Sequence, residues 1–104
     1  MAGATLKEAD IIKEGYIVKQ ARYLKDWRSR WYVLTEWHLL KYRGKRNSED
    51  GKIPLRVYPL YKIKATKLHN GTIRLRYKSR ILKIKGTDSN QTTTWYELLD
   101  KYIT

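Results

Sequence analysis

Apolar and polar residues alternate with a period of two through most of this chain, which is the spacing of a β-strand that buries one face. The segment 26–35, "DWRSRWYVLT", shows the alternation most clearly, with its arginines on one face and its tryptophans on the other. β-Branched and aromatic residues, which are enriched in strands, fill three further segments. We therefore predict strands at 14–19, 26–35, 37–43 and 80–85.

Turn-forming residues divide the middle of the chain. Asn70-Gly71 predicts a two-residue hairpin turn, in which both residues need positive φ, with 64–69 and 72–77 as its arms. Pro59 breaks the run 53–69, because proline cannot donate a ladder hydrogen bond. The polar stretch 44–52 contains glycine near both ends and predicts a loop.

The periodicity changes near the C-terminus. Asp88 or Ser89 is a suitable N-cap, and Gln91 follows Asp88 at the capping-box spacing. The apolar residues that follow lie at i, i+3, i+4 and i+7, which is one face of a helix; they are Trp95, Leu98, Leu99 and Tyr102. The chain is thus expected to be mainly β (α+β): about seven antiparallel strands in two orthogonal sheets, with one C-terminal α-helix covering an open corner.

The length of 104 residues suits one domain, which we place at 11–104 after a flexible lead-in at 1–10. The chain has no cysteine, which excludes disulfides, thiolate metal sites and a cysteine nucleophile. A small domain without disulfides is typical of a reducing, cytoplasmic location. We find no apolar run of the roughly 20 residues that a membrane-spanning helix needs, and no targeting peptide at the N-terminus.

The net charge of +13 is unevenly distributed. The stretch 52–85 contains eleven Lys or Arg residues and no acid. A field of this sign attracts an anionic partner, which leaves nucleic acid, a membrane leaflet and an acidic protein as candidates.

The segment 19–31, "KQARYLKDWRSRW", concentrates cations in a predicted hairpin. If its turn centres between Tyr23 and Leu24, the numbers of cross-strand partners sum to 47. Lys19 then lies directly opposite Arg28, with Arg30 on the diagonal of the same face. Because like charges directly opposite one another are destabilising, this arrangement favours an anionic ligand that compensates them.

Catalysis is not indicated. His38 and His69 are the only histidines, and neither belongs to a cluster of metal-ligand or triad type. The six glycines form no phosphate-cradling loop. We therefore predict a non-enzyme with no catalytic residues, metal or cofactor.

Three features together resemble the pleckstrin homology (PH) domain family: the opening "KEGYIVK…KDWRSRWYVL" with Gly15, the number of strands, and Trp95 in the C-terminal helix. The resemblance covers roughly 12–104 and implies a seven-stranded antiparallel barrel capped by one helix. Within the family, "KEGYIVKQARYLKDWRSRWYVL" and "YKSRILKIKG" are most similar to the N-terminal PH domain of protein kinase B. The chain departs from that domain at Arg22, where protein kinase B has an acid.

The resemblance implies a membrane-recruitment module that binds 3-phosphorylated inositol lipid headgroups, the 3,4,5-trisphosphate or the 3,4-bisphosphate. It also implies a monomeric domain at the inner face of the plasma membrane or another phosphoinositide-bearing membrane, with a serine/threonine kinase as the parent protein. The headgroup ligands that it implies are Lys19, Arg28, Arg30, Arg22, Lys25, Tyr42 and Arg80. The implied membrane-interface residues are Tyr23 and Leu24.

Two other functions fit the residues. The same fold could serve as a protein-interaction module with only non-specific affinity for anionic lipid. A small basic β-barrel with exposed aromatics could instead bind nucleic acid by stacking bases, although the helical Trp95 and the Lys19 to Arg30 hairpin count against this.

Overall fold

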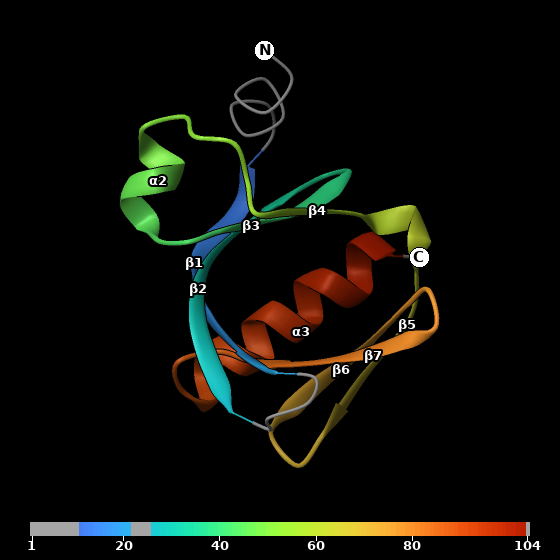
Figure 1. Cartoon of the computed structure of the whole chain (residues 1–104). Helices are drawn as coiled ribbons and strands as arrows, with labels where there is room; N and C mark the ends of the chain where they lie inside the picture. The colour runs from blue at the N-terminus through green and yellow to red at the C-terminus, as the bar shows by residue number, and fades with distance from the viewer. Residues whose placement is uncertain (1–10, 22–25, 104) are drawn as a thin grey trace.

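The computed structural model describes residues 11–21 and 26–103 and forms an antiparallel sheet that curves around one long helix (Figure 1). The strands are β1 (Ile11–Gln20), β2 (Trp27–Thr35), β3 (His38–Tyr42), β4 (Arg56–Pro59), β5 (Ile63–His69), β6 (Thr72–Tyr77) and β7 (Arg80–Lys85). The helical elements are α2 (Lys45–Glu49), the 3₁₀ turn η1 (Leu60–Lys62) and α3 (Ser89–Ile103). The predicted fold of seven antiparallel strands and one C-terminal helix is confirmed.

The seven strands follow the order β4-β3-β2-β1-β7-β6-β5, so the sheet is unclosed and β4 and β5 are its edges. Among the residues that the structure describes, β1 joins the β1–β4 half to the β5–β7 half through two cross-strand pairs, Val18 with Lys85 and Lys19 with Ile84. This short seam lies at the end of β1 that carries the predicted cation hairpin. The seam therefore brings β7 beside the candidate site.

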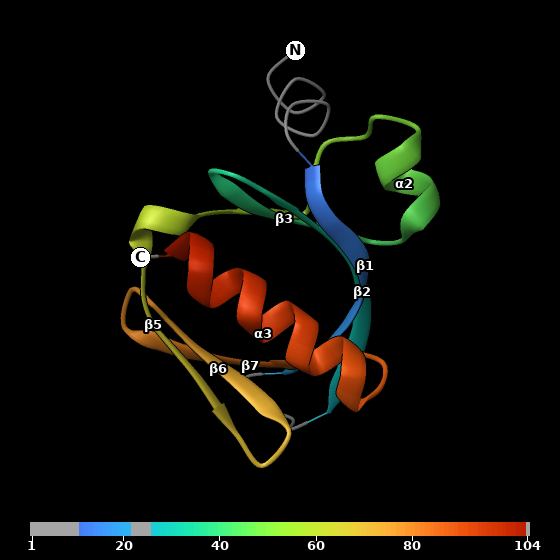
Figure 2. The same ribbon diagram turned by 180° about the vertical axis from the view of Figure 1, so that it is seen from behind.

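The inner face of the curved sheet holds the main core. Each strand contributes its alternate apolar residues to that face, among them Ile17, Tyr32 and Leu75, all at most 1% exposed. α3 closes one side of this core with Trp95 and Leu99, which are 1% and 0% exposed (Figure 2). The helical tryptophan is thus a core residue, as the apolar spacing of α3 predicts.

α3 begins where its sequence predicts. The Asp88 side chain caps the helix, because its Oδ1 accepts a 2.8 Å hydrogen bond from the Gln91 N–H. The Thr92 hydroxyl accepts a second bond, of 2.8 Å, from the Gly86 N–H. A Cβ on Gly86 would lie 2.7 Å from the backbone of Gln91 and Thr92, so only glycine allows this close approach.

The β5–β7 half contains two tight turns, and the first is the one that the sequence predicts. Asn70 and Gly71 have φ values of 51° and 72°, as the predicted two-residue hairpin requires. Lys78, between β6 and β7, has a φ of 57°. Pro59 ends β4 and leads directly into η1, which is the predicted break.

The prediction of a loop over 44–52 is wrong in part, because α2 occupies its first half. Ser48 anchors this short helix: its side chain is fully buried and its N–H bonds to the Gly44 carbonyl at 3.4 Å. Lys45 and Glu49 form a 4.0 Å ion pair one turn apart, and the Lys45 ammonium lies 5.8 Å from the Trp31 ring centroid. Tertiary contact with the outer face of the sheet thus stabilises a segment whose composition suggests a loop.

Candidate anion-binding site

The predicted hairpin register is confirmed. Lys19 pairs directly with Arg28, Ile17 pairs with Arg30, and the numbers of both pairs sum to 47. Arg28 and Arg30 alternate with Ser29 and so share the inner face with Lys19. All three line one hollow of about 150 Å³. The sequence-predicted core of the site is therefore brought together by β1 and β2.

The next two strands add two cations that the sequence did not single out. Lys41 of β3 pairs with the inner-face residue Tyr32 of β2, and Arg56 of β4 pairs with Lys41. Lys41 lines the same hollow as Arg28 and Arg30. Both cations thus lie on the same inner face as Lys19 and Arg28, in the neighbouring cross-strand row that contains Tyr32.

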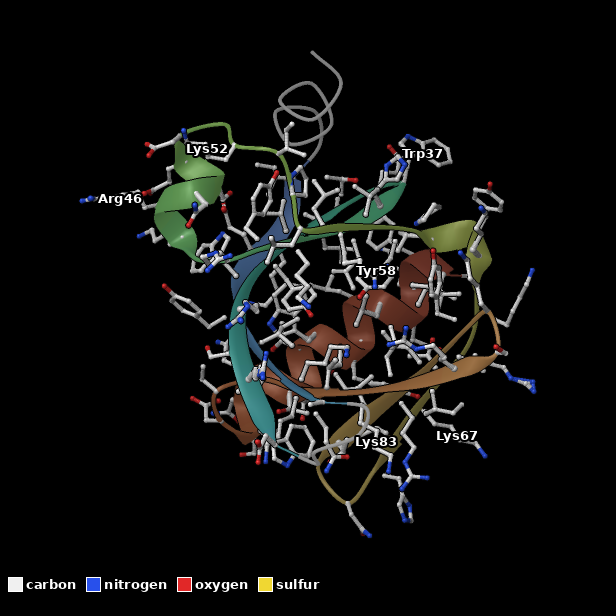
Figure 3. The ribbon with its side chains drawn as sticks, in the orientation of Figure 1. Trp37, Arg46, Lys52, Tyr58, Lys67 and Lys83 are labelled. Atoms are coloured by element: carbon white, nitrogen blue, oxygen red, sulfur yellow. The ribbon has the colours of Figure 1, made fainter. Side chains whose placement is uncertain are left out.

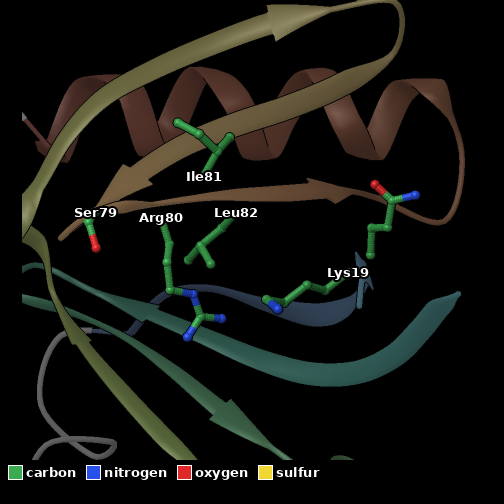
Figure 4. A pocket seen from close by; sticks show the side chains of 6 residues that line it. Lys19, Ser79, Arg80, Ile81 and Leu82 are labelled. Atoms are coloured by element: carbon green, nitrogen blue, oxygen red, sulfur yellow. The ribbon is translucent and has the colours of Figure 1, made fainter. Parts of the chain in front are cut away.

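Arg80 completes the group from the other half of the sheet. It alternates with the core residues Leu82 and Ile84 at the start of β7, which places it on the inner face. Lys19 and Arg80 line a hollow of about 220 Å³ and extend toward one another across it (Figure 4). Lys19 lines both hollows and so connects them. We call these six inner-face residues the cation cluster: Lys19, Arg28, Arg30, Lys41, Arg56 and Arg80.

Burial and the neighbouring cations lower the pKa of the two lysines of the cluster. Burial, followed by repulsion from Lys19 and then Arg30, lowers the pKa of Lys41 to about 8. Burial, followed by repulsion from Arg80 and then Arg56, also lowers the pKa of Lys19. In the part of the chain that the structure describes, none of the six forms an ion pair with a carboxylate. The site is therefore a positive cleft whose charge is not compensated by the described residues.

Two tyrosines lie beneath the cluster. Burial raises the pKa of Tyr58, while the neighbouring Arg56 and then Arg80 act against this rise. Burial likewise raises the pKa of Tyr32 far above its usual range. Both phenols therefore stay neutral at physiological pH and add no negative charge that would neutralise the cations.

Tyr42 is not brought to this site. It pairs with Trp31, whose side chain lies on the outer face, and it packs in a separate buried cluster with Trp31, Val33 and Leu40. The structure instead places the preceding residue, Lys41, on the face that lines the hollow. Both faces of β3 are apolar, with Leu39 in the inner core and Leu40 in the outer cluster, so the sequence pattern alone does not single out Lys41.

The loop candidates Arg22, Tyr23, Leu24 and Lys25 lie outside the described residues. A backbone hydrogen bond of 2.6 Å from the Ala21 N–H to the Asp26 carbonyl places the two ends of this loop side by side.

Among the described residues, no group of His, Cys, Asp and Glu side chains is arranged to hold a metal ion. None of the described helices is both long and apolar enough to span a bilayer.

A comparison with protein families matches residues 5–80 to the PH domain. The chain belongs to the PH domain family. The solved structures that resemble this PH domain include a chain from a systematic screen for protein–lipid interactions in Saccharomyces cerevisiae. The two chains have a TM-score of 0.81 and 17% sequence identity, and the match covers 91% of this chain and 97% of that one.

Two further similar structures contain an inositol phosphate. The Slm1 PH domain in complex with inositol-4-phosphate has a TM-score of 0.77 and 16% identity, over 91% of this chain and 98% of that one. The C-terminal PH domain of pleckstrin in complex with D-myo-Ins(1,2,3,5,6)P5 has a TM-score of 0.73 and 19% identity, over 90% and 96%. At these identities the likeness establishes the shared fold of the PH domain.

Proposed function

We propose that this PH domain binds the headgroup of a 3-phosphorylated phosphoinositide and thereby recruits its parent protein to a membrane. The observation that carries the proposal is the convergence of the cation cluster. Its six cations come from five strands and share the inner face, five of them line two hollows that meet at Lys19, and none has a carboxylate partner among the described residues. The inositol phosphates in the Slm1 and pleckstrin PH domains support a ligand of this class.

Each cation has a role that follows from its chemistry. The guanidinium groups of Arg28 and Arg30 bind phosphate oxygens in pairs, since the arginine fork matches their spacing. Lys19 contributes a point charge between the two hollows and so reaches two phosphates. Lys41 and Arg80 stand on opposite sides of Lys19 and bind the outlying phosphates.

The finer features of the proposal rest on the resemblance to protein kinase B. The 3-phosphate lies between Lys19 and Arg28, the 3,4,5-trisphosphate and 3,4-bisphosphate are the preferred headgroups, and Arg22 and Lys25 add contacts from the loop. Tyr23 and Leu24 enter the membrane interface. The parent protein is a serine/threonine kinase that the monomeric domain brings to the inner face of the plasma membrane.

Sedimentation with liposomes tests this function. Vesicles of phosphatidylcholine carry each phosphoinositide in turn or phosphatidylserine alone, at two salt concentrations. We expect 3-phosphorylated lipids to bind most tightly, and Arg28→Ala to weaken this binding by a factor on the order of 10 to 100, since a hydrogen bond to a charged group contributes about 1.5–3 kcal/mol.

Arg46→Ala is the matched control, because Arg46 lies on α2 outside the cluster (Figure 3). Equal binding to every anionic vesicle, unchanged by Arg28→Ala, would refute the headgroup site. It would favour the protein-interaction module with non-specific lipid affinity. Tight binding of single-stranded nucleic acid without lipid selectivity would favour the base-stacking alternative.

A further inference from the structure

Ser79 lies in the tight turn that joins β6 to β7, at the rim of the larger hollow. It is exposed to solvent and follows Lys78, whose φ is 57°. Ser79 lines the hollow of about 220 Å³ together with Lys19 and Arg80. Figure 4 shows the Ser79 hydroxyl directed to the same side of β7 as the Arg80 side chain. A group attached to this hydroxyl would therefore lie against the two cations.

The residues around Ser79 in the sequence are basic. Lys78 precedes it, Arg80 follows it, and Arg76 lies three residues before it. Protein kinases select their substrates in part by charge pattern, and this pattern is complementary to a kinase with an acidic substrate groove. An exposed turn is also the part of a domain that another enzyme reaches most readily. Ser79 thus has both the sequence and the accessibility of a phosphorylation site.

The other serines of the described structure lack this combination. Ser48 is fully buried beneath α2. Ser89 follows the acidic Asp88 at the start of α3. Ser29 lies on the outer face of β2, because it alternates with the inner-face arginines on either side of it. Ser79 alone is exposed, has basic neighbours and lines a hollow of the cation cluster.

A phosphate on Ser79 would compensate the cations that face it. Phosphoserine carries roughly −1.5 to −2 charges at pH 7 and has three strong acceptor oxygens. Lys19 stands directly opposite Arg28, and its pKa is lowered by burial and then by Arg80. A phosphate placed against arginine and lysine forms about one to three charge-assisted hydrogen bonds. The phosphate would therefore relieve the repulsion that a headgroup otherwise relieves.

We propose that Ser79 is a regulatory phosphorylation site whose phosphate occupies the hollow between Lys19 and Arg80 and competes with the phosphoinositide headgroup. A separate protein kinase selective for basic substrates transfers the γ-phosphoryl group of a nucleoside triphosphate. The bond from the Ser79 Oγ to phosphorus forms, the bond from phosphorus to the β-phosphate oxygen breaks, and the nucleoside diphosphate leaves. The hydroxyl proton passes to a base of the kinase. This inference rests on the proposed function, because the headgroup is what the phosphate displaces.

The attached phosphate competes well because it belongs to the same chain. A group held by a short tether has an effective concentration of roughly millimolar at its neighbouring site. It also loses less translational freedom on binding than a separate ligand does. Arg28, Arg30 and Lys41 line the other hollow and remain available to the headgroup. Modification should therefore weaken membrane binding rather than abolish it.

Vesicle affinity of a site-specifically phosphorylated domain tests the competition. Phosphoserine is incorporated during translation at position 79 and, as the matched control, in place of Thr93 on the exposed side of α3. The probe is phosphatidylcholine vesicles with phosphatidylinositol 3,4,5-trisphosphate. We expect affinity to fall by a factor on the order of 10 to 100 for position 79, as the loss of a hydrogen bond to a charged group predicts. An equal loss at position 93 would overturn the proposal, because net charge alone would then explain the effect.

The titration of the phosphate tests its contact with the cations in the absence of lipid. The second pKa of phosphoserine is about 6, and the two cations should hold it below that value at position 79. A ³¹P NMR titration measures it, and Lys19→Gln combined with Arg80→Gln should return it toward 6. An unshifted pKa in the parent domain would overturn the proposal. A lowered pKa in a domain whose unmodified form binds no phosphoinositide would refute the proposed function while the phosphate contact stands.

A kinase assay tests the modification itself. The folded domain is incubated with ATP and a panel of serine/threonine kinases that prefer basic substrates, and mass spectrometry of its peptides locates the phosphate. We expect modification at Ser79, and Ser79→Ala should lose it. If no kinase of the panel modifies Ser79 in the folded domain, the assignment of this residue as a phosphorylation site is wrong.

Discussion

Lys19 stands directly opposite Arg28 in the ladder between β1 and β2, and both side chains line the same hollow. Two cations in directly opposed positions raise the free energy of the ligand-free fold. Burial and the nearby Arg80 and Arg56 add to this effect at Lys19, whose pKa is lowered. The repulsion is present before any ligand arrives, and a bound phosphate would convert it into attraction.

Lys19→Gln should therefore make the ligand-free domain more stable and a weaker binder. We expect the free energy of unfolding to rise by roughly 0.5–1 kcal/mol, the size of a cross-strand charge effect, and vesicle affinity to fall about tenfold or more. Urea denaturation and liposome sedimentation measure the two quantities. Lys52→Gln, an exposed loop position, is the control and should change neither by much. A Lys19→Gln domain that is less stable than the parent would show that Lys19 contributes packing that outweighs its repulsion.

The lowered pKa of Lys41, about 8, predicts that binding depends on pH near neutrality. Above pH 8 the free domain carries a neutral Lys41, so affinity for a phosphorylated headgroup should fall by roughly tenfold between pH 7 and 9. Binding at pH 8 should take up protons, because the anion favours the charged amine. Titration calorimetry in buffers of different ionisation enthalpy measures that uptake.

The stability of the free domain should change in the opposite direction. Lys41 has an ordinary pKa of 10.5 when it is exposed, so the unfolded chain binds more protons than the native domain between pH 8 and 10.5. Stability should therefore rise with pH across this window. Lys41→Arg keeps the charge at every pH and is the control, since it should flatten the dependence of affinity on pH. Persistence of the full dependence in Lys41→Arg would assign the titration to Lys19 or to another group.

The hairpin part of the site could be predicted from the sequence because it depends on local geometry. A turn position fixes the register of two adjacent strands, and strand alternation then fixes which cations share a face. Lys19, Arg28 and Arg30 meet both conditions within thirteen residues. The register that they predict is the one the structure has.

β3 shows why the rest could not be predicted in the same way. Leu39 packs in the inner core and Leu40 in the outer cluster, so both faces of this strand are apolar and alternation does not identify the inner one. The same ambiguity made Tyr42 as plausible as Lys41. Arg56 could not be predicted from the sequence for another reason. Its position depends on the pairing of β3 with β4, which are separated in the chain by α2. Such pairing is set by tertiary packing rather than by a short turn.

Tyr42→Phe should separate the two neighbouring residues of β3. Because the Tyr42 ring is buried on the outer face, removing its hydroxyl should leave vesicle affinity within twofold of the parent. Lys41→Gln is the matched change at the next position and should weaken binding about tenfold, as loss of a charge-assisted hydrogen bond predicts. Sedimentation with phosphoinositide vesicles at pH 7 compares them. If Tyr42→Phe lost more vesicle affinity than Lys41→Gln, Tyr42 rather than Lys41 would be the residue of β3 that contacts the headgroup.

Gly86→Ala should destabilise the domain by about 1–3 kcal/mol, the usual effect of forcing atoms into a packed region. The added Cβ would lie 2.7 Å from the backbone at Gln91 and Thr92, and neither backbone can yield without moving the first turn of α3. That shift would also strain the 2.8 Å bond from the Gly86 N–H to the Thr92 hydroxyl. Gly44→Ala is the control, because its Cβ would meet only the Asn47 side chain at 3.7 Å and its φ of −158° is open to any residue. Urea denaturation that finds the two variants equally stable would show that α3 is free to shift away from β7.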